Sequence, residues 1–82
     1  MTWNDRSDRI ARDGPALIWA QIADDIRADL DAGRLKAGDK LPSDFDLAAS
    51  YGVARSTARR ALFELTGEGR LVVVFGRGTF VA

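Results

Sequence analysis

The sequence predicts one small domain that is mainly α-helical, with three helices followed by a β-hairpin of two or three antiparallel strands. Apolar residues recur at helical spacing in three segments between residues 14 and 69, and each segment is closed by a glycine. Residues 71–81 are instead β-branched and aromatic on either side of a Gly-Arg-Gly turn. With 82 residues the chain has room for one core only.

The first helix is expected to open at Gly14-Pro15 and to stop at Gly33, because proline suits the first helical turn. Its apolar residues form one stripe, namely Leu17, Ile18, Ile22, Ile26 and Leu30. Four aspartates lie mostly off that stripe, namely Asp24, Asp25, Asp29 and Asp31. Since no histidine accompanies them, we expect a solvated face rather than a metal or acid/base site.

Residues 1–13 alternate in charge and have little apolar periodicity, so we expect a flexible N-terminal arm before a domain that spans residues 14–82. Pro42 favours an extended Leu41, which suits a very short strand. The second helix then begins at Ser43, because Ser43-Asp44-Phe45-Asp46 fits a capping pattern, and it ends at Gly52.

The third helix resumes directly after Gly52-Val53-Ala54, and its narrow apolar face contains small residues that permit close approach to a neighbouring helix. Two helices joined by so short a turn match the helix-turn-helix motif. Leu71–Phe75 and Thr79–Val81 should pair around Gly76-Arg77-Gly78. Together these elements predict a winged helix-turn-helix domain, in which the hairpin is the wing.

Composition excludes several classes of function. The chain has no cysteine and no histidine, which removes disulfides, Cys/His metal sites, thiol nucleophiles and imidazole bases. We therefore expect no enzyme, no cofactor and no metal. No apolar run approaches the roughly 20 residues of a membrane helix, and the acidic start does not fit a signal peptide, so we expect a cytoplasmic protein.

The formal net charge is zero, but the charges are unevenly distributed along the chain. Residues 1–54 carry a net charge of −3 and residues 55–82 a net charge of +3, so a polyanion would meet the C-terminal third first. On the third helix Arg55 and Arg59 have no acid four residues further on, whereas Arg60 is followed by Glu64 at that spacing.

This pattern favours double-stranded DNA as the partner. A helix fits the major groove, where arginine reads guanine, and Arg77 between two glycines could enter the adjacent minor groove. Ser56, Thr57, Arg60 and the first amides of the helix suit phosphate oxygens. An ordinary solvated face and a plain hairpin turn are the alternatives for these residues. At the level of function, the alternative is a protein-interaction module anchored by Phe45, Phe63 and Phe75.

Residues 15–81 resemble the N-terminal DNA-binding domain of GntR-type bacterial transcription regulators. The matching residues include Gly33-Arg34-Leu35, Leu41-Pro42-Ser43, Leu47-Ala48, Tyr51-Gly52-Val53, Arg55-Ser56-Thr57 and Gly76-Arg77-Gly78-Thr79-Phe80-Val81. The resemblance implies a repressor that binds a palindromic operator as a homodimer, with bases read by Arg55 and Arg59. It also implies phosphate contacts from Ser43, Ser56 and Thr57, and groove contact from the wing at Gly76, Arg77 and Gly78.

The sequence departs from this family at three positions. Phe45 stands near a position where a DNA-contacting arginine is common, Ala54 replaces a capping Ser or Thr, and Arg60 replaces a glutamate. These differences predict an operator unlike the commonest half-site. Family members also continue into a C-terminal domain that binds a small-molecule effector, so an effector is expected only if such a domain lies outside this chain, and we favour truncation over a stand-alone repressor.

Overall fold

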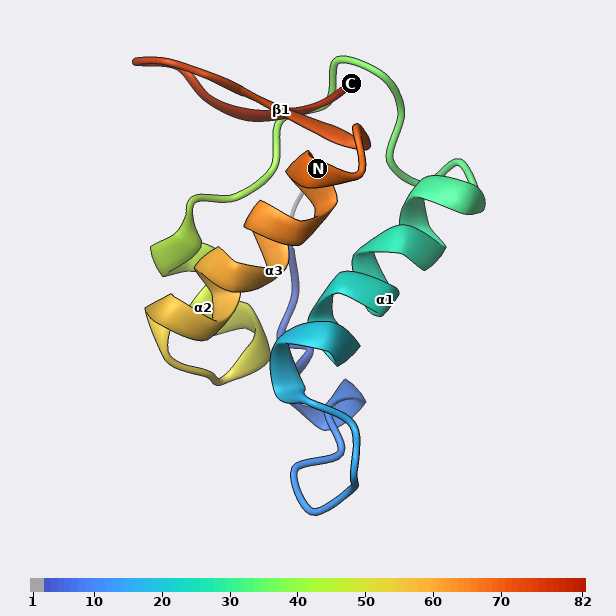
Figure 1. Cartoon of the computed structure of the whole chain (residues 1–82), viewed down its shortest axis with the longest axis vertical. Helices are drawn as coiled ribbons and strands as arrows, with labels where there is room; N and C mark the ends of the chain where they lie inside the picture. Colours follow the sequence, from blue (N-terminus) through green and yellow to red (C-terminus); the bar gives the residue numbers. More distant parts are fainter. Residues whose placement is uncertain (1–2) are drawn as a thin grey trace.

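A computed structural model describes residues 3–82. Its elements are η1 (Ser7–Arg9), α1 (Ile18–Asp31), α2 (Asp44–Tyr51), α3 (Arg55–Gly67), β1 (Leu71–Val74) and β2 (Gly78–Val81). Helix α3 packs against both α1 and α2, and the hairpin extends across the end of the helical layer beyond the C-terminal end of α3 (Figure 1). This arrangement confirms the predicted winged helix-turn-helix.

The core lies where the apolar faces of the three helices meet. Its largest fully buried side chains are Tyr51, Ile22, Ile26, Leu47 and Leu65. Leu71 and Val81, which face each other across the two strands, are also buried and join the hairpin to this core. The packing therefore fixes the base of the wing relative to α3.

Helix α1 begins at Ile18, later than the predicted start at Gly14-Pro15. The side chain of Gln21 explains the difference, because it hydrogen-bonds backbone groups that precede the helix. Its amide nitrogen donates to the carbonyl oxygens of Ala11 at 2.9 Å and Ala16 at 3.0 Å, and its oxygen accepts from the Ala11 amide at 2.8 Å. These bonds hold residues 11–16 as a loop.

The short turn between α2 and α3 forms as the sequence predicts. Ser43 caps α2, since its Oγ accepts a hydrogen bond from the Asp46 amide at 3.1 Å. Gly52 ends α2 in the left-handed conformation with φ of 67°, where a side chain would be strained. Ala54 precedes α3 without any side-chain cap, as its methyl group requires.

The wing is a two-stranded antiparallel ribbon in which Leu71 pairs with Val81 and Val74 with Gly78. The predicted strand near Leu41 is reduced to a single bridge between Lys40 and Phe80, supported by a hydrogen bond from the Leu41 amide to the Thr79 carbonyl at 2.8 Å. Gly78 has φ of 125°, and a Cβ there would lie 2.9 Å from Cε of Lys40. The end of the Lys40 side chain could move aside, so it is the positive φ that favours glycine where the wing meets the segment before α2.

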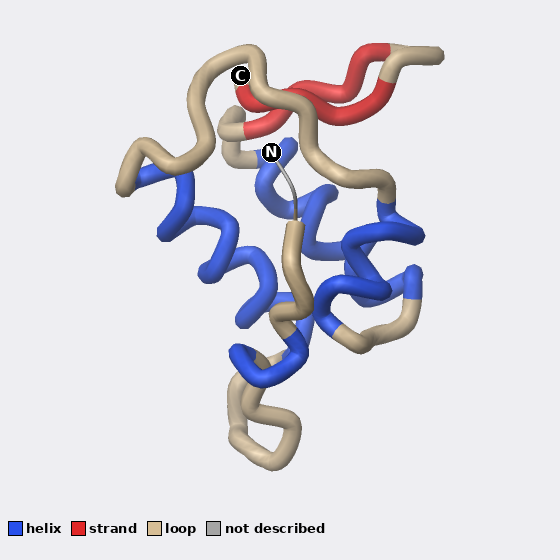
Figure 2. The backbone as a smooth tube through the Cα atoms, turned by 180° about the vertical axis from the view of Figure 1, so that it is seen from behind, coloured by secondary structure: helices blue, strands red, loops and turns tan. Residues whose placement is uncertain are grey.

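The start of the chain is packed, which differs from the flexible arm predicted for residues 1–13. Residues 3–10 run between α1 and α2 (Figure 2), and Arg6 and Ile10 are buried. The Arg6 amide donates to the Ser50 carbonyl at 2.6 Å, and Ser50 Oγ donates to the Asn4 carbonyl at 2.6 Å. Polar contacts rather than apolar periodicity hold this segment, and residues 1–2 lie outside the described part of the chain.

Arg6 also corrects the prediction that the α1 aspartates form a solvated face. Its Nη1 donates to Asp29 at 2.9 Å, to Asp25 at 3.1 Å and to the Tyr51 hydroxyl at 3.1 Å, and the Asp29 side chain is only 3% exposed. The guanidinium carbon lies 3.9 Å from the centroid of the Trp3 ring. Asp25 and Asp29 therefore bind the N-terminal segment rather than solvent, whereas the side chains of Asp24 and Asp31 are 75% and 68% exposed, as predicted.

Candidate nucleic-acid interface

Helix α3 presents Arg55 and Arg59 on its exposed side. Ala58, Ala61 and Leu65 turn inward and are fully buried, so residues one turn apart on the opposite side face solvent. The side chains of Arg55 and Arg59 are 56% and 63% exposed. The helix face that the sequence predicts to be cationic is therefore accessible.

Asp44, the first residue of α2, pairs with both arginines. Its Oδ1 accepts from Nη2 of Arg55 at 3.1 Å, and its Oδ2 accepts from Nε of Arg59 at 3.0 Å. Neither arginine has an acid four residues further along α3, and the acid that pairs with them comes from the preceding helix. The two guanidinium groups are thereby held beside each other.

The contacts of Asp44 are strong enough to orient the arginines but weak enough to be exchanged. Burial would raise the pKa of Asp44, but hydrogen bonds from Arg59 and Arg55 outweigh it and hold that pKa below its ordinary value. Ion pairs with partners this exposed contribute about 0–1 kcal/mol each. A base edge or phosphate can therefore replace the carboxylate, and the trio keeps one net positive charge.

Arg60 does not join Arg55 and Arg59. Its Nε donates to Glu64 at 3.0 Å, the spacing that the sequence predicts, and its guanidinium carbon lies 4.5 Å from the Trp19 ring centroid of α1. The side chain therefore leans toward α1.

Ser56 is exposed and Thr57 half-buried at the start of α3. Within residues 3–82 the amides of Arg55 and Ser56 have no acceptor, which leaves them directed at solvent.

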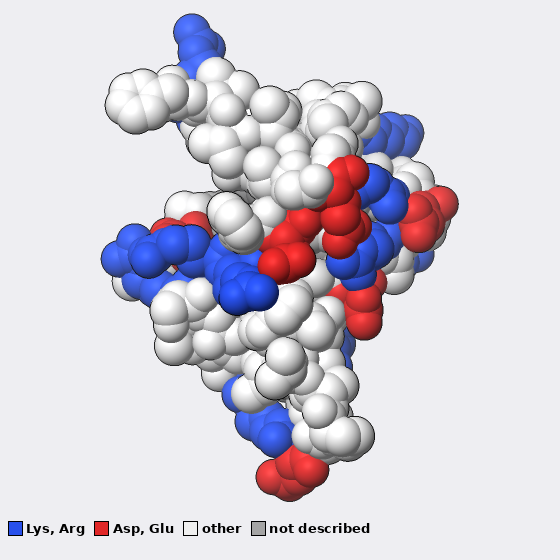
Figure 3. Space-filling model, viewed as in Figure 1, with Lys and Arg blue, Asp and Glu red and all other residues white. Residues whose placement is uncertain are grey.

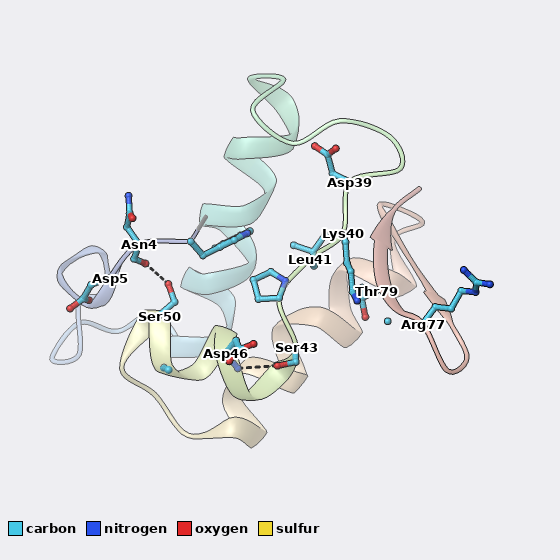
Figure 4. Close-up of a pocket in the computed structure, with 14 residues that line it drawn as sticks. Asn4, Asp5, Asp39, Lys40, Leu41, Ser43, Asp46, Ser50, Arg77 and Thr79 are labelled. Atoms are coloured by element: carbon cyan, nitrogen blue, oxygen red, sulfur yellow. Dashed lines mark hydrogen bonds between the residues drawn. The ribbon is translucent and has the colours of Figure 1, made fainter. Parts of the chain in front are cut away.

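A cleft separates the start of α2 from the wing, and Ser43 and Arg77 lie on its two sides (Figure 4). Lys40 and Thr79 also line it, whereas Asp39 and Asp46 bring negative charge to its wall. Within residues 3–82 no acid lies within ion-pair distance of Arg77, which points away from the cleft wall. Gly76 and Arg77 are exposed at the turn, and Gly78 is half-buried at its base.

Basic side chains gather at one edge of the molecule over α2 and α3, and another lies near the tip of the projecting wing (Figure 3). The surface is hollowed between these two regions. The acidic side chains in this view are concentrated toward the middle and the opposite side. A cationic helix face and a protruding hairpin therefore border the same concavity.

Other kinds of site find little support in residues 3–82. No group of three or more acidic side chains there could hold a metal ion. No helix in the described part of the chain is long and apolar enough to cross a membrane. The fold and the arginine-bearing face instead define a winged helix-turn-helix domain of the DNA-binding class.

Comparisons with known proteins identify the family. Residues 19–81 match the family model described as bacterial regulatory proteins, gntR family, and the chain belongs to this family. It is 41% identical to the histidine utilization repressor of Klebsiella aerogenes over 71 residues. The aligned region covers 87% of this chain and 30% of the relative. The repressor NagR of Bacillus subtilis is 37% identical over 73 residues, again across 30% of its length.

Solved structures agree with this assignment. YtrA from Sulfolobus acidocaldarius, a GntR-family transcription factor, superposes with a TM-score of 0.81 at 38% identity, over 89% of this chain and 61% of that one. The DNA-binding domain of AraR, solved in complex with an operator, superposes with a TM-score of 0.77 at 32% identity, over 89% and 94% of the two chains. These relatives are transcription regulators and not enzymes.

The sequence alone does not identify two residues of this surface, Asp44 and Lys40, as members of the site. Asp44 is an intervening residue of the capping pattern that begins at Ser43, and no spacing rule connects it with arginines 11 and 15 residues later. The sequence indicates no role for Lys40, which lies against Gly78 and lines the cleft. For Lys40, the position just before Leu41-Pro42-Ser43 is the local signal that could have indicated membership of the site. For Asp44, only the tertiary contact of α2 with α3 reveals that it pairs with the arginines.

Proposed function

We propose that this chain is the operator-binding part of a transcription repressor that binds palindromic double-stranded DNA as a pair of copies. Helix α3 enters the major groove, where Arg55 and Arg59 read base edges, and Arg77 of the wing enters the adjacent minor groove. Ser43, Ser56 and Thr57 contact phosphates, and Arg60 adds positive charge at the edge of the contact. The curated relatives are about three times longer than the matched region, so effector binding and dimer formation belong to this proposal as well.

The observation that carries the proposal is the pairing of Arg55 and Arg59 through Asp44 on an exposed face. Arginine can donate two hydrogen bonds to O6 and N7 of guanine, and such a pair discriminates by about 1–3 kcal/mol. Two guanidinium groups held side by side could address neighbouring base pairs. The operator-bound AraR domain supports the same placement of the fold on DNA.

The test is selection of bound duplexes from a random-sequence pool, followed by titration of the selected duplex. Arg55→Ala and Arg59→Ala should each lower affinity for the selected duplex by about 5- to 100-fold, with little change for random duplexes. Arg70→Ala is the matched control, because Arg70 pairs with Asp31 of α1 rather than with α2 or α3. It should leave the selected sequence unchanged.

Arg77→Ala tests the wing separately. Loss of one phosphate-rich contact should reduce the slope of log affinity against log salt by about one and weaken binding on all sequences. Recovery of no preferred sequence by the unsubstituted domain would refute the proposed function and favour the protein-interaction module. An unchanged salt slope for Arg77→Ala would remove only the wing from the interface.

A further inference from the structure

Phe45 is an exposed aromatic residue placed beside the paired arginines. It is the second residue of α2, directly after Asp44, and it is 62% exposed. The guanidinium carbon of Arg55 lies 5.8 Å from the centroid of its ring. Exposing a phenyl ring to water is unfavourable, and the Phe45 ring is not part of the hydrophobic core of this domain.

The other exposed phenylalanines occupy different places. Phe63 is 71% exposed on α3 and lines a groove with Val73 and Thr79 of the wing. Phe75 is fully exposed at the turn after β1, next to Gly76. Among residues 3–82, the aromatic ring found over Arg55 is therefore that of Phe45.

We propose that Phe45 contacts the C5-methyl group of a thymine next to the base that Arg55 reads, and so adds a thymine requirement to each half-site. This inference rests on the proposed function and extends it. A phenyl ring has no donor or acceptor for a base edge, and the thymine methyl is the one apolar group that the major groove displays. Because Asp44 holds Arg55 and Arg59, the ring and both guanidinium groups approach a duplex together.

The ring could instead act only on Arg55, through a cation–π contact that supports its orientation. The two roles differ in what they require of the DNA. A supporting role depends on the arginine and not on any methyl group. A reading role disappears when the methyl group is removed from the DNA while the protein is left intact.

The experiment replaces each thymine of the selected duplex by deoxyuridine, one at a time, and measures affinity for the unsubstituted domain and three variants. Burial of one methyl group predicts a loss of about three- to fivefold at one thymine per half-site, beside the position that Arg55→Ala affects. Phe45→Ala should bind the thymine and uracil duplexes equally. Phe45→Leu should keep a loss of about twofold or more, because leucine is still apolar at this position.

Phe75→Ala is the matched control, because it removes the same ring from another exposed site. It should keep the full uracil penalty at that thymine. Uracil tolerated at every position, a selected site without thymine there, or an equal penalty in Phe45→Ala would each overturn the methyl contact. These outcomes still require a selected sequence, whereas failure to select any sequence overturns the proposed function itself.

Discussion

Replacing Arg6 with methionine tests whether the N-terminal segment is part of the folded domain. Methionine keeps an unbranched apolar side chain of related length but cannot donate to Asp25, Asp29 or Tyr51. Removing one partner of a buried pair costs about 3–5 kcal/mol. Here the lower end applies, because Asp29 retains a hydrogen bond from Arg34 at 2.7 Å.

A loss of about 3 kcal/mol is large for this chain. Domains of about 80 residues have free energies of unfolding of roughly 4–12 kcal/mol. The midpoint of thermal unfolding should therefore fall by roughly 15 °C, and the urea midpoint by about 1–3 M. Circular dichroism at a helix-sensitive wavelength should be used, since Trp3 fluorescence reports directly on the substituted residue.

Arg9→Met is the matched control for this measurement. Arg9 belongs to the same segment and also donates to Asp25, but its side chain is 48% exposed. The expected loss is at most about 1 kcal/mol. Equal unfolding midpoints for the two variants would refute the claim that the buried guanidinium attaches this segment to α1 and α2.

Two further outcomes concern stability. Burial would raise the pKa of Asp29, but hydrogen bonds from Arg34 and Arg6 outweigh it and hold that pKa below its ordinary value. The stability that this carboxylate provides is therefore complete above the ordinary aspartate pKa of about 4 and is lost as the pH falls below that value, through the lowered pKa of the folded state. Acid titration of the unfolding midpoint should show this loss, with a smaller acid dependence in Arg6→Met. Gly78→Ala should cost about 1–3 kcal/mol because of its φ of 125°, whereas Gly67→Ala, with open space in α3, should be neutral or stabilising in the same unfolding assay.

Local rules predicted the helix-turn-helix well. The Ser43 cap and the left-handed Gly52 depend on neighbouring residues only, so the sequence contains their whole cause. The hairpin followed for the same reason, since β-branched residues around two glycines leave few other structures. The exposed positions of Arg55 and Arg59 are a consequence of the apolar face opposite them.

Apart from the start of α1, the features that the sequence did not predict depend on contacts between distant segments. Arg6 meets Asp29 23 residues later and Tyr51 45 residues later. From the sequence alone, a charged residue in a segment of alternating charge is predicted to face solvent, because the distant acids that bind it cannot be identified. The same limit applies to Asp44 and Arg59, because helical spacing identifies partners only within one helix.

The zero net charge is compatible with DNA binding because many acids are already paired away from the arginine face. Asp25 and Asp29 bind Arg6, Glu68 binds Arg27, and Asp31 binds Arg70. Yet Asp39 and Asp46 still line the cleft near the wing, so few phosphates can be neutralised by one copy. A small number of phosphate contacts gives weak binding at physiological salt. Under the proposed function, two copies on adjacent half-sites are then needed for stable occupancy of the operator, because linking two weak binding events raises the overall affinity above that of either one.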